Sequence, residues 1–320
     1  MAFTLAALGL AALACDPAAP ARDGGGTSPD LDGGSVDAGR PAEGSDAAMP
    51  AADAGMGPPR TLGTAERPAT LVVPSAHDGV TPLPVAILLH GYSTAGNIQD
   101  LYFGASRHAR ANGYYLVIPD GTRDAGGNRF WNATPACCDF GGTGVDDVAY
   151  LRGLLDQVEA SVPVDTTRVY FFGHSNGGYM SFRMACELSD RITAIVSLAG
   201  ADFLGDMDCV PTRPLSVLQV HGTLDTSVAY GGSAAYPSAR AAVVRAATRA
   251  GCDPMSVQTL DPLDLDTTLP GSETRVERWS TGCMTGLDAE LWTIEAGLHI
   301  PTFGPSWMPA IMGWMLRHQR

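Results

Sequence analysis

Residues 168–180 read RVYFFGHSNGGYM, and this stretch decides the fold. Its first part is an apolar run rich in aromatic residues, which is typical of a buried strand. From Gly177 onward the pattern becomes helical. The residues between match the G-x-S-x-G turn that joins a strand to a helix. This context predicts that Ser175 is a nucleophile lifted above the edge of a sheet.

The turn around Ser175 places physical demands on its neighbours. The serine backbone is expected to be strained, so Gly173 and Gly177 are needed as small residues on either side. Glycine and serine also favour ordinary turns, so the motif alone is common, and the strand before it and the helix after it give it weight. We assign His174, next to the nucleophile, to substrate binding.

A serine nucleophile needs a base, and the base needs an orienting acid. In this type of fold the chain order is serine, acid, histidine. Asp225 follows a predicted strand and is the predicted acid, and His299, beyond the last predicted strand, is the predicted base. The alternatives are an Asx-turn for Asp225 and a surface loop for His299. His221 is then predicted to be a structural turn residue.

The developing negative charge on a substrate carbonyl needs two hydrogen-bond donors, which form an oxyanion hole. The backbone N–H of Asn176, directly after the nucleophile, is the first predicted donor. The second is predicted to be the backbone N–H of Tyr92, in the loop that follows the apolar run VAILL. His90 precedes the serine in the chain, and we interpret it as a residue that orders this loop.

Short apolar runs alternate with helical stretches from residue 61 onward. Strands are predicted at residues 69–73, 85–89, 115–118, 169–172, 194–198, 216–220 and 291–294, and helices at residues 98–111, 145–160, 177–188, 234–250 and 307–318. Continuous Val/Ile/Leu runs separated by helices indicate an α/β fold with a mostly parallel sheet covered on both faces. About 260 residues fit a single catalytic domain at residues 61–320.

The N-terminal part of the chain has a different composition. Residues 1–15, MAFTLAALGLAALAC, resemble a secretory signal. They end in a pattern close to a bacterial lipobox, so Cys15 is a candidate for lipidation and membrane anchoring; the alternative is a cleaved signal with an incidental cysteine. Residues 16–60 are rich in Ala, Gly, Pro and Asp, and we predict a disordered linker because they cannot bury enough apolar area to offset ordering entropy.

Charge and composition exclude some classes of partner. The chain of 320 residues has a net charge of −14, and all of its 20 basic residues are arginine. An acidic chain without a basic cluster argues against nucleic acid. No apolar run after the N-terminus is long enough for a spanning helix. We expect a monomer with no metal and no organic cofactor.

Six cysteines lie in the predicted domain: Cys137, Cys138, Cys186, Cys209, Cys252 and Cys283. In an exported protein six cysteines suggest three disulfides, for which 15 pairings exist. We expect the adjacent Cys137 and Cys138 to pair with two different partners. A zinc site is the competing interpretation, but a vicinal pair without C-x-x-C spacing suits it poorly.

Several motifs in one order resemble a known family, the secreted polyhydroxybutyrate depolymerase and feruloyl-esterase-like α/β hydrolases. They include LLHGYS, VIPDGT, Trp131-Asn132, Cys137-Cys138, VDDVAYLRGLLD, HGTLDTSVAY and the histidine of GLHIP, and the resemblance covers residues 72–314. It implies the α/β-hydrolase fold, with nucleophile, acid and base at Ser175, Asp225 and His299. It also favours a Cys252–Cys283 disulfide, and we expect the remaining bonds to involve Cys186 and Cys209.

One position departs from the family pattern. The family often has a tryptophan shortly after its histidine, whereas this chain reads Gly297-Leu298-His299-Ile300-Pro301. That residue often borders the substrate groove, so the substrate preference is open. We predict that Trp131 and Trp307 supply aromatic substrate surface instead, with core packing as the alternative for Trp131.

Together these patterns predict a serine esterase, extracellular or attached to the cell envelope. The predicted substrate is a polymeric or bulky ester such as a polyhydroxyalkanoate, with feruloyl or acetyl esters of plant polysaccharide as the alternative. Two other interpretations stay open: a serine peptidase of the same fold, and a non-catalytic binding lipoprotein that kept the fold.

Overall fold

A computed structural model describes residues 60–320 of the chain. The predicted signal at residues 1–15, the candidate lipidation site Cys15 and residues 16–59 of the predicted linker lie outside the described residues. Arg60, which we had placed at the end of the linker, is the first residue of a strand. The described fold therefore begins one residue before the predicted domain boundary.

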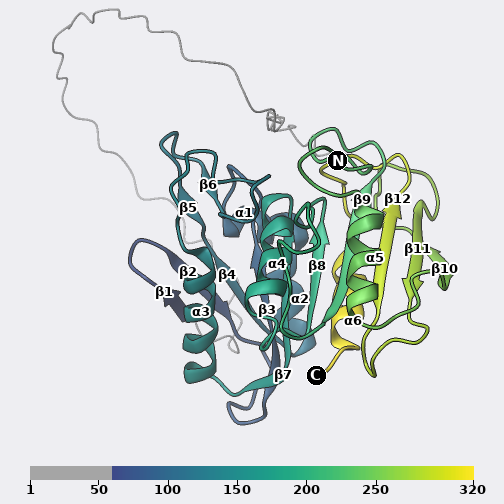
Figure 1. The fold of residues 1–320 in the computed structure, drawn as a ribbon. Helices are drawn as coiled ribbons and strands as arrows, with labels where there is room; N and C mark the ends of the chain where they lie inside the picture. The colour runs from purple at the N-terminus through teal and green to yellow at the C-terminus, as the bar shows by residue number, and fades with distance from the viewer. Residues whose placement is uncertain (1–59) are drawn as a thin grey trace, which may run out of the picture.

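The described residues form a ten-stranded sheet in the order β1-β2-β4-β3-β7-β8-β9-β12-β11-β10 (Figure 1). The six central strands run parallel: β4 (Tyr115–Pro119), β3 (Leu83–Leu89), β7 (Val164–His174), β8 (Ala194–Leu198), β9 (Ser216–Gly222) and β12 (Ala289–Ile294). The antiparallel edges are β1 (Arg60–Gly63) and β2 (Pro68–Val72) on one side, and β11 (Thr274–Trp279) and β10 (Val257–Leu263) on the other. Two short strands, β5 (Thr122–Arg123) and β6 (Arg129–Phe130), form a separate hairpin.

Helices cover both faces of this sheet, as predicted (Figure 1). On one face lie α3 (Asp147–Ser161), α4 (Asn176–Glu187) and α5 (Ala239–Arg249). On the other lie α1 (Gly96–Phe103), α2 (Ala105–Asn112) and α6 (Trp307–Leu316). This arrangement is the α/β-hydrolase architecture, in which every central strand is buried on both sides.

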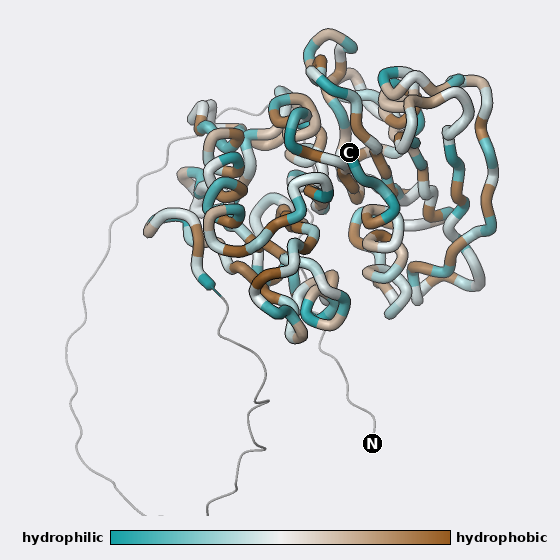
Figure 2. The backbone as a smooth tube through the Cα atoms, turned by 90° about the horizontal axis from the view of Figure 1, so that it is seen from below, coloured by the Kyte–Doolittle hydropathy of each residue, from teal (hydrophilic) through white to brown (hydrophobic). Residues whose placement is uncertain are grey.

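Alternating side chains of the central strands pack into two separate hydrophobic cores, one on each face of the sheet. Along β3, Val85, Ile87 and Leu89 enter one core, while Ala86 and Leu88 enter the other. Figure 2 shows the hydrophobic segments running through the interior, with hydrophilic backbone mostly at the periphery. Full burial of one large apolar side chain stabilises the fold by about 1.5–3 kcal/mol. Because these strands are buried on both faces, apolar residues are favoured at successive positions, which gives the continuous apolar runs in the sequence.

The predicted helix at residues 98–111 is two helices in the structure. Gly104 separates α1 from α2 and adopts a left-handed conformation with φ of 72°. Its backbone N–H donates to the carbonyl oxygen of Asp100 at 2.7 Å. Glycine reaches this conformation without steric cost, so it ends α1 and redirects the chain.

Of the outer strands, β2 was predicted at residues 69–73, whereas β1, β10 and β11 were not, because their residues do not form apolar runs. β10 is exposed along almost its whole length, and it contains Pro262, a residue that sheets accept at an edge. In β11 the charged residues Arg275, Glu277 and Arg278 interrupt the apolar pattern. Glu277 is paired with Arg240 and Arg275, so its burial is compensated by charge.

The six cysteines of the described part form three disulfides: Cys137–Cys138, Cys186–Cys209 and Cys252–Cys283. The pairing of Cys252 with Cys283, which the resemblance favoured, is confirmed. The expectation that Cys137 and Cys138 bond to two different partners is wrong. Cys186 and Cys209 lie together beside the C-terminal part of α4 and bond to each other, so the adjacent cysteines have no other partner in the described residues.

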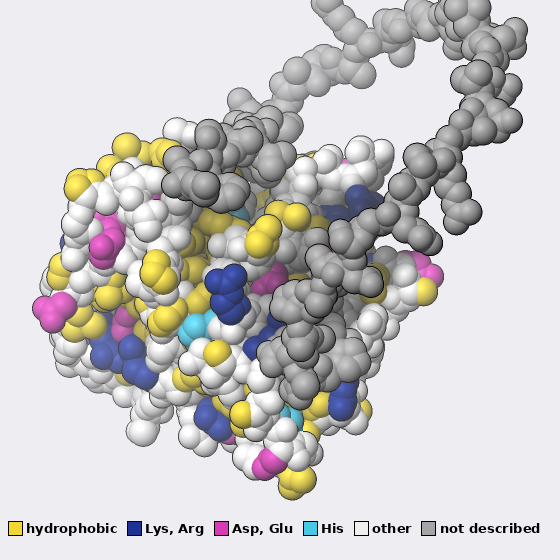
Figure 3. All heavy atoms as spheres, turned by 180° about the vertical axis from the view of Figure 1, so that it is seen from behind, with side chains coloured by type: hydrophobic (Ala, Val, Ile, Leu, Met, Phe, Trp, Pro, Cys, Tyr) yellow, Lys and Arg dark blue, Asp and Glu magenta, His cyan; other side chains and the backbone are white. Residues whose placement is uncertain are grey.

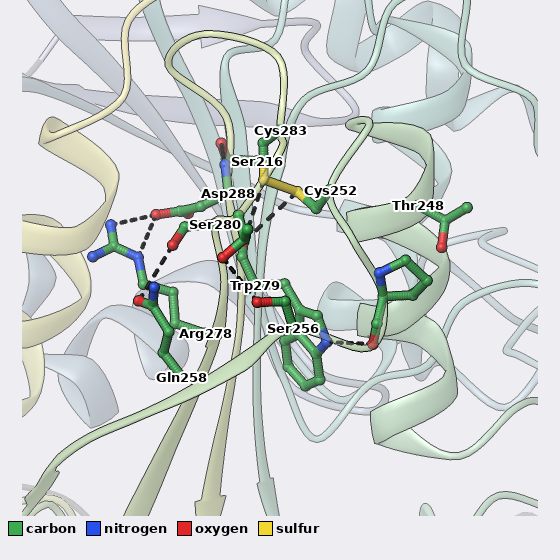
Figure 4. The surroundings of a disulfide bond; sticks show 12 residues. Ser216, Thr248, Cys252, Ser256, Gln258, Arg278, Trp279, Ser280, Cys283 and Asp288 are labelled. Carbon is green, nitrogen blue, oxygen red and sulfur yellow. Dashed lines mark hydrogen bonds and ion pairs between the residues drawn. A yellow bond between two sulfur atoms is a disulfide. The ribbon is translucent and has the colours of Figure 1, made fainter.

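The Cys252–Cys283 disulfide joins the end of α5 to the loop after β11 (Figure 4). Both sulfur atoms lie within 3.7 Å of the carbonyl oxygen of Trp279. The indole N–H of Trp279 donates to the carbonyl of Pro254 at 3.1 Å. The disulfide therefore holds an antiparallel edge of the sheet against the helix that covers it.

Replacing Cys283 with serine is expected to lower the free energy of unfolding by about 2–4 kcal/mol, because a loop of about 31 residues would no longer be closed in the unfolded chain. The measurement is the guanidinium midpoint of wild type and variant under oxidising conditions. A double variant lacking Cys252 as well is the matched control, because it removes the unpaired thiol. Equal midpoints for wild type and both variants would show that this bond does not stabilise the domain.

Among residues 60–320 there is no helix long and apolar enough to cross a membrane. On the face opposite to the view of Figure 1, hydrophobic side chains lie in scattered patches with arginines between them (Figure 3).

Candidate active site

Ser175 lies at the junction of β7 and α4, where the sequence placed it. Its backbone has φ of 54° and ψ of −119°, which is a strained conformation for a residue with a side chain. The backbone N–H of Ser175 donates to the carbonyl of Leu198 at 2.8 Å, on the neighbouring strand β8. Strain of this kind costs about 1–3 kcal/mol and persists only where the surrounding structure holds it.

The two glycines of the motif are required by close contacts, as predicted. A Cβ atom on Gly177 would lie 2.2 Å from the carbonyl oxygen of Leu89. One on Gly173 would lie 2.6 Å from the backbone of Gly177. Both distances are shorter than a real side chain can tolerate, so α4 lies this close to β3 and β7 because neither residue has a side chain.

The loops after β9 and β12 are joined by backbone hydrogen bonds. The N–H of Thr223 donates to Ile294 at 3.0 Å, and that of Leu224 donates to Gly297 at 2.9 Å. A Cβ on Gly222 would lie 2.3 Å from the carbonyl oxygen of Gly297, so glycine permits the contact. Asp225 and His299 therefore lie on two loops that form one rigid unit at the carboxyl edge of the sheet.

The structure brings Ser175, Asp225 and His299 together. The Nδ1 atom of His299 lies 2.8 Å from Oδ2 of Asp225, and its Nε2 atom lies 3.0 Å from the Ser175 hydroxyl. Because a carboxylate can only accept, Nδ1 carries the proton, and Nε2 accepts the hydrogen bond donated by the serine hydroxyl. This is the geometry in which a histidine withdraws a proton from a serine nucleophile.

Asp225 is held as a carboxylate in a buried site. Burial by itself raises its pKa, but hydrogen bonds from His221 and His299 outweigh this effect and hold the pKa well below its usual value. Its second oxygen accepts from the backbone N–H groups of Ser227 and Val228 at 2.8 and 2.9 Å. The acid is therefore charged and fixed in orientation before substrate binds.

His221 does more than the turn residue that the sequence predicted. Its side chain is 1% exposed, and its Nε2 atom lies 3.2 Å from Oδ2 of Asp225 and 2.8 Å from the carbonyl of Val228. The amide of Gln219 lies 2.9 Å from Nδ1, so Nδ1 accepts and Nε2 carries the proton. His221 therefore donates to the predicted acid. The spacing H-G-x-x-D is the sequence signal that could have shown this.

His174, assigned to substrate binding from the sequence, is buried. Its Nε2 atom donates to the carbonyl oxygen of His299 at 2.9 Å, and the two rings lie 4.9 Å apart. Burial, together with repulsion from His299, lowers the pKa of His174 to about 3. The structure thus gives His174 a positioning role for the loop of His299, in place of a contact with substrate.

The pKa of His174 predicts how stability depends on pH. In the unfolded chain a histidine has a pKa near 6.5, so between about pH 6.5 and pH 3 the unfolded state binds more protons than the folded state. Stability should therefore decrease as pH falls, by roughly 2 kcal/mol at pH 5 from this group. Urea midpoints at pH 7.5 and pH 5.0 should differ less in His174→Gln than in wild type. An identical pH dependence in the two proteins would contradict the prediction.

The loop after β3 lies against the nucleophile. A Cβ on Gly91 would lie 3.6 Å from Cβ of Ser175, so this loop passes directly beside the serine. The hydroxyl of Tyr92 donates to Asp124 at 2.6 Å, which anchors the loop from the far side. The predicted second donor of the oxyanion hole, the Tyr92 N–H, thus lies on a segment adjacent to Ser175.

His90 orders this loop, as the sequence suggested. Its Nε2 atom accepts from the N–H of Gly121 at 2.8 Å, and its Nδ1 atom donates to the carbonyl of Gly91 at 2.8 Å. Burial lowers the pKa of His90 to about 4, so the ring is neutral near pH 7. It holds the backbone at Gly91 and has no contact with the nucleophile that would make it a base.

Asn176, the other predicted oxyanion donor, is the first residue of α4. Its backbone N–H is one of the helix N-terminal amides that have no acceptor within the helix. Its buried side chain exchanges two hydrogen bonds with the backbone of Trp131, at 2.7 and 2.9 Å, and lies 3.5 Å from the sulfur of Cys137. The segment that carries the vicinal disulfide is therefore fastened to the residue after the nucleophile.

The two tryptophans predicted to supply substrate surface lie in the interior. Trp131 is 0% exposed, and its indole N–H donates to the carbonyl of His90 at 3.0 Å. Trp307 is 1% exposed and stacks on Phe303 with ring centroids 3.8 Å apart. Both predictions are corrected: the aromatic surfaces pack in the core, which was the alternative considered for Trp131.

A serine, histidine and aspartate in this arrangement, at the carboxyl edge of a mostly parallel sheet, define a serine hydrolase of the α/β-hydrolase fold. No family model matches the chain. Its sequence is 29% identical to feruloyl esterase B of Piromyces equi over 50% of the chain and 29% of that protein. It is 27% identical to feruloyl esterase D of Neurospora crassa over 63% of the chain and 59% of that protein.

The fold is similar to that of an acetyl xylan esterase from Aspergillus awamori, with a TM-score of 0.58 over 82% of this chain and 100% of that one. At 13% identity this likeness concerns the fold alone. The chain spans less than two thirds of the length of either curated relative. The chain is similar in sequence to feruloyl esterases, as the resemblance implied. Neither of these two relatives is named a polyhydroxybutyrate depolymerase.

Proposed function

We propose that this protein is a serine esterase that uses Ser175, His299 and Asp225. The observation that carries the proposal is the unbroken pair of contacts from the Ser175 hydroxyl through His299 to Asp225, at 3.0 and 2.8 Å. No residue of this set is displaced from hydrogen-bonding distance, so the site is formed without a conformational change.

The reaction follows from these contacts. The Ser175 oxygen attacks the ester carbonyl carbon while Nε2 of His299 takes its proton. The carbonyl oxygen becomes an oxyanion, for which the N–H groups of Tyr92 and Asn176 are the proposed donors. His299 then gives its proton to the leaving oxygen, and the alcohol departs. Water attacks the acyl group with His299 as base, which releases the acid and restores the serine.

For the substrate we propose a bulky ester, and the relatives support an ester carried by a plant polysaccharide. The two relatives described above are named feruloyl esterases, and a third, from Neocallimastix patriciarum, is named a bifunctional acetylxylan esterase/xylanase. A polyhydroxyalkanoate stays the alternative, since the same triad would cleave it. We further propose export, because three disulfides persist in oxidising compartments. Lipid anchoring through Cys15 and a monomeric state remain predictions.

The direct test is a panel of polymeric substrates with wild-type protein: feruloylated arabinoxylan, acetylated xylan and polyhydroxybutyrate film. We expect release of ferulate or acetate and little release of hydroxybutyrate. Hydrolysis of short p-nitrophenyl esters is the control for an active preparation. Preferred release from the film would replace the polysaccharide proposal with the polyester.

Two other classes make different predictions. A serine peptidase with this triad would cleave peptide amides, which an esterase leaves intact. A binding protein without activity would leave Ser175 unlabelled by a fluorophosphonate, whereas a nucleophilic serine forms a covalent adduct. Stoichiometric labelling with ester turnover and no cleavage of peptide amides would exclude both.

A further inference from the structure

A polar groove lies beside the proposed oxyanion hole and is not part of the triad. It has a volume of about 380 Å³, within the range of small-molecule sites. It is formed by the segment between β6 and α3, the C-terminal part of α4 and the loop after β8 (Figure 1). Since its walls come from three separate segments, the groove exists only in the folded protein.

One end of the groove reaches the catalytic machinery. Its wall includes Cys137, whose sulfur lies 3.5 Å from the side chain of Asn176. It also includes Phe140, whose ring lies 5.5 Å from that of Tyr92. A molecule at this end of the groove would therefore lie next to both segments that carry the proposed oxyanion donors. The other end is farther away, because Arg183 and Glu187 lie about 12 and 18 Å along α4 from Ser175.

The lining combines aromatic rings with hydrogen-bonding groups. Phe140 is 61% exposed, an unusual exposure for a phenyl ring, and Phe203 is partly exposed. The polar groups are the carboxylates of Asp139, Glu187 and Asp208 and the guanidinium of Arg183. Glu187 is half exposed, and its contact with Arg183 is long, at 3.8 Å, so its oxygens remain available to a ligand.

This chemistry favours a neutral, hydroxyl-rich ring over an aliphatic chain. An apolar chain in the groove would desolvate three carboxylates and a guanidinium without replacing their hydrogen bonds, which is costly. Sugar hydroxyls donate to carboxylates and accept from guanidinium, and the C–H faces of a sugar ring can cover phenyl rings. An anionic ligand is disfavoured, because the groove carries three carboxylates and only one guanidinium.

We propose that this groove binds sugar units on the alcohol side of the ester, with the unit nearest the scissile bond at the Phe140 end of the groove. This inference rests on the proposed esterase function, and it assigns a binding site to the alcohol part of the substrate. Phe140 would pack on one sugar ring, and Glu187 with Arg183 would bind hydroxyls of a unit farther along the chain.

The test compares two esters with one acyl group and different alcohols: methyl ferulate and a feruloylated arabino-oligosaccharide. We expect the ratio of kcat/KM for the sugar ester to that for the methyl ester to fall at least tenfold in Phe140→Ala and in Glu187→Ala. Met255→Ala, an exposed apolar residue away from the groove, is the control and should keep the wild-type ratio. An unchanged ratio in both groove variants would overturn the proposal.

A second measurement separates this proposal from the esterase function. Calorimetric titration of wild-type protein with an unesterified arabinoxylo-oligosaccharide needs no catalysis, and the same titration of Phe140→Ala should show at least tenfold weaker binding. No binding to wild type would overturn the groove proposal even if esters are cleaved. Binding without hydrolysis of any ester would leave the groove proposal standing and contradict the esterase. A larger loss for a hydroxybutyrate oligomer than for the sugar ester would reassign the groove to an aliphatic substrate.

Discussion

Ser175→Ala is expected to lower kcat for p-nitrophenyl acetate about a millionfold, which leaves at most a slow residual reaction. The hydroxyl is the atom that forms the covalent bond to the substrate, and alanine offers no replacement. His299 would still be held by Asp225 at 2.8 Å, and the oxyanion donors would remain in place. Any residual rate would come from those groups acting on a bound water molecule.

The measurement is initial rate against ester concentration for both proteins, with the thermal midpoint as a test of folding. The removed hydroxyl contributes one contact at the surface of the site, so the midpoint should change little. Ser233→Ala, an exposed loop serine, is the matched control and should keep full activity. Equal rates for wild type and Ser175→Ala would remove Ser175 from the mechanism.

Asp225→Asn should lower kcat about ten-thousandfold, with a much smaller effect on KM. The carboxylate accepts a proton-bearing Nδ1 of His299, and an amide can present its N–H there instead. The histidine would then take the other tautomer and could no longer accept the serine proton at Nε2. Loss of the negative charge also removes the stabilisation of the imidazolium that forms during the reaction.

The pH dependence of this variant provides a second readout. Burial raises the pKa of Asp225, but hydrogen bonds from His221 and His299 hold it well below its usual value, so the wild-type carboxylate stays charged throughout the range near neutrality. The defect of Asp225→Asn should therefore be present across pH 6–8 and should not be mimicked by mild acidification of wild type. Asp156→Asn, a surface acid paired with Arg191, is the control. Near-normal activity of Asp225→Asn would assign the acid to another residue.

The central part of the fold was predictable because consecutive residues of each central strand carry the pattern that identifies it. Strands buried on both faces must be apolar along their whole length, so β3, β8 and β9 can be recognised from sequence alone. The outer strands β10 and β11 lack that signal. β11 carries Arg275, Glu277 and Arg278, and Glu277 pairs with Arg275 and with Arg240 of α5, a contact that exists only once the distant helix packs against the strand.

The candidate site was predictable to the extent that chain order determines it. Asp225 followed a predicted strand, and His299 was the only well-placed histidine after it; these two residues are the pair that lies beside the serine. The residues that support the site were not predictable in the same way. His221 was interpreted as a turn residue, and His174 as a substrate contact, because sequence position does not show which way a side chain points.

By itself, the sequence of this protein determined the fold class, the strained turn at Ser175 and the identity of the three residues of the site. Apolar runs, the spacing of the G-x-S-x-G motif and the order of residues along the chain are all properties of the sequence alone. Only the tertiary structure decided what the other side chains contact. It buried Trp131 and Trp307, bonded Cys137 to Cys138 and placed Phe140 at the edge of an open groove. These outcomes depend on which distant segments pack together, and no local pattern of residues specifies that packing.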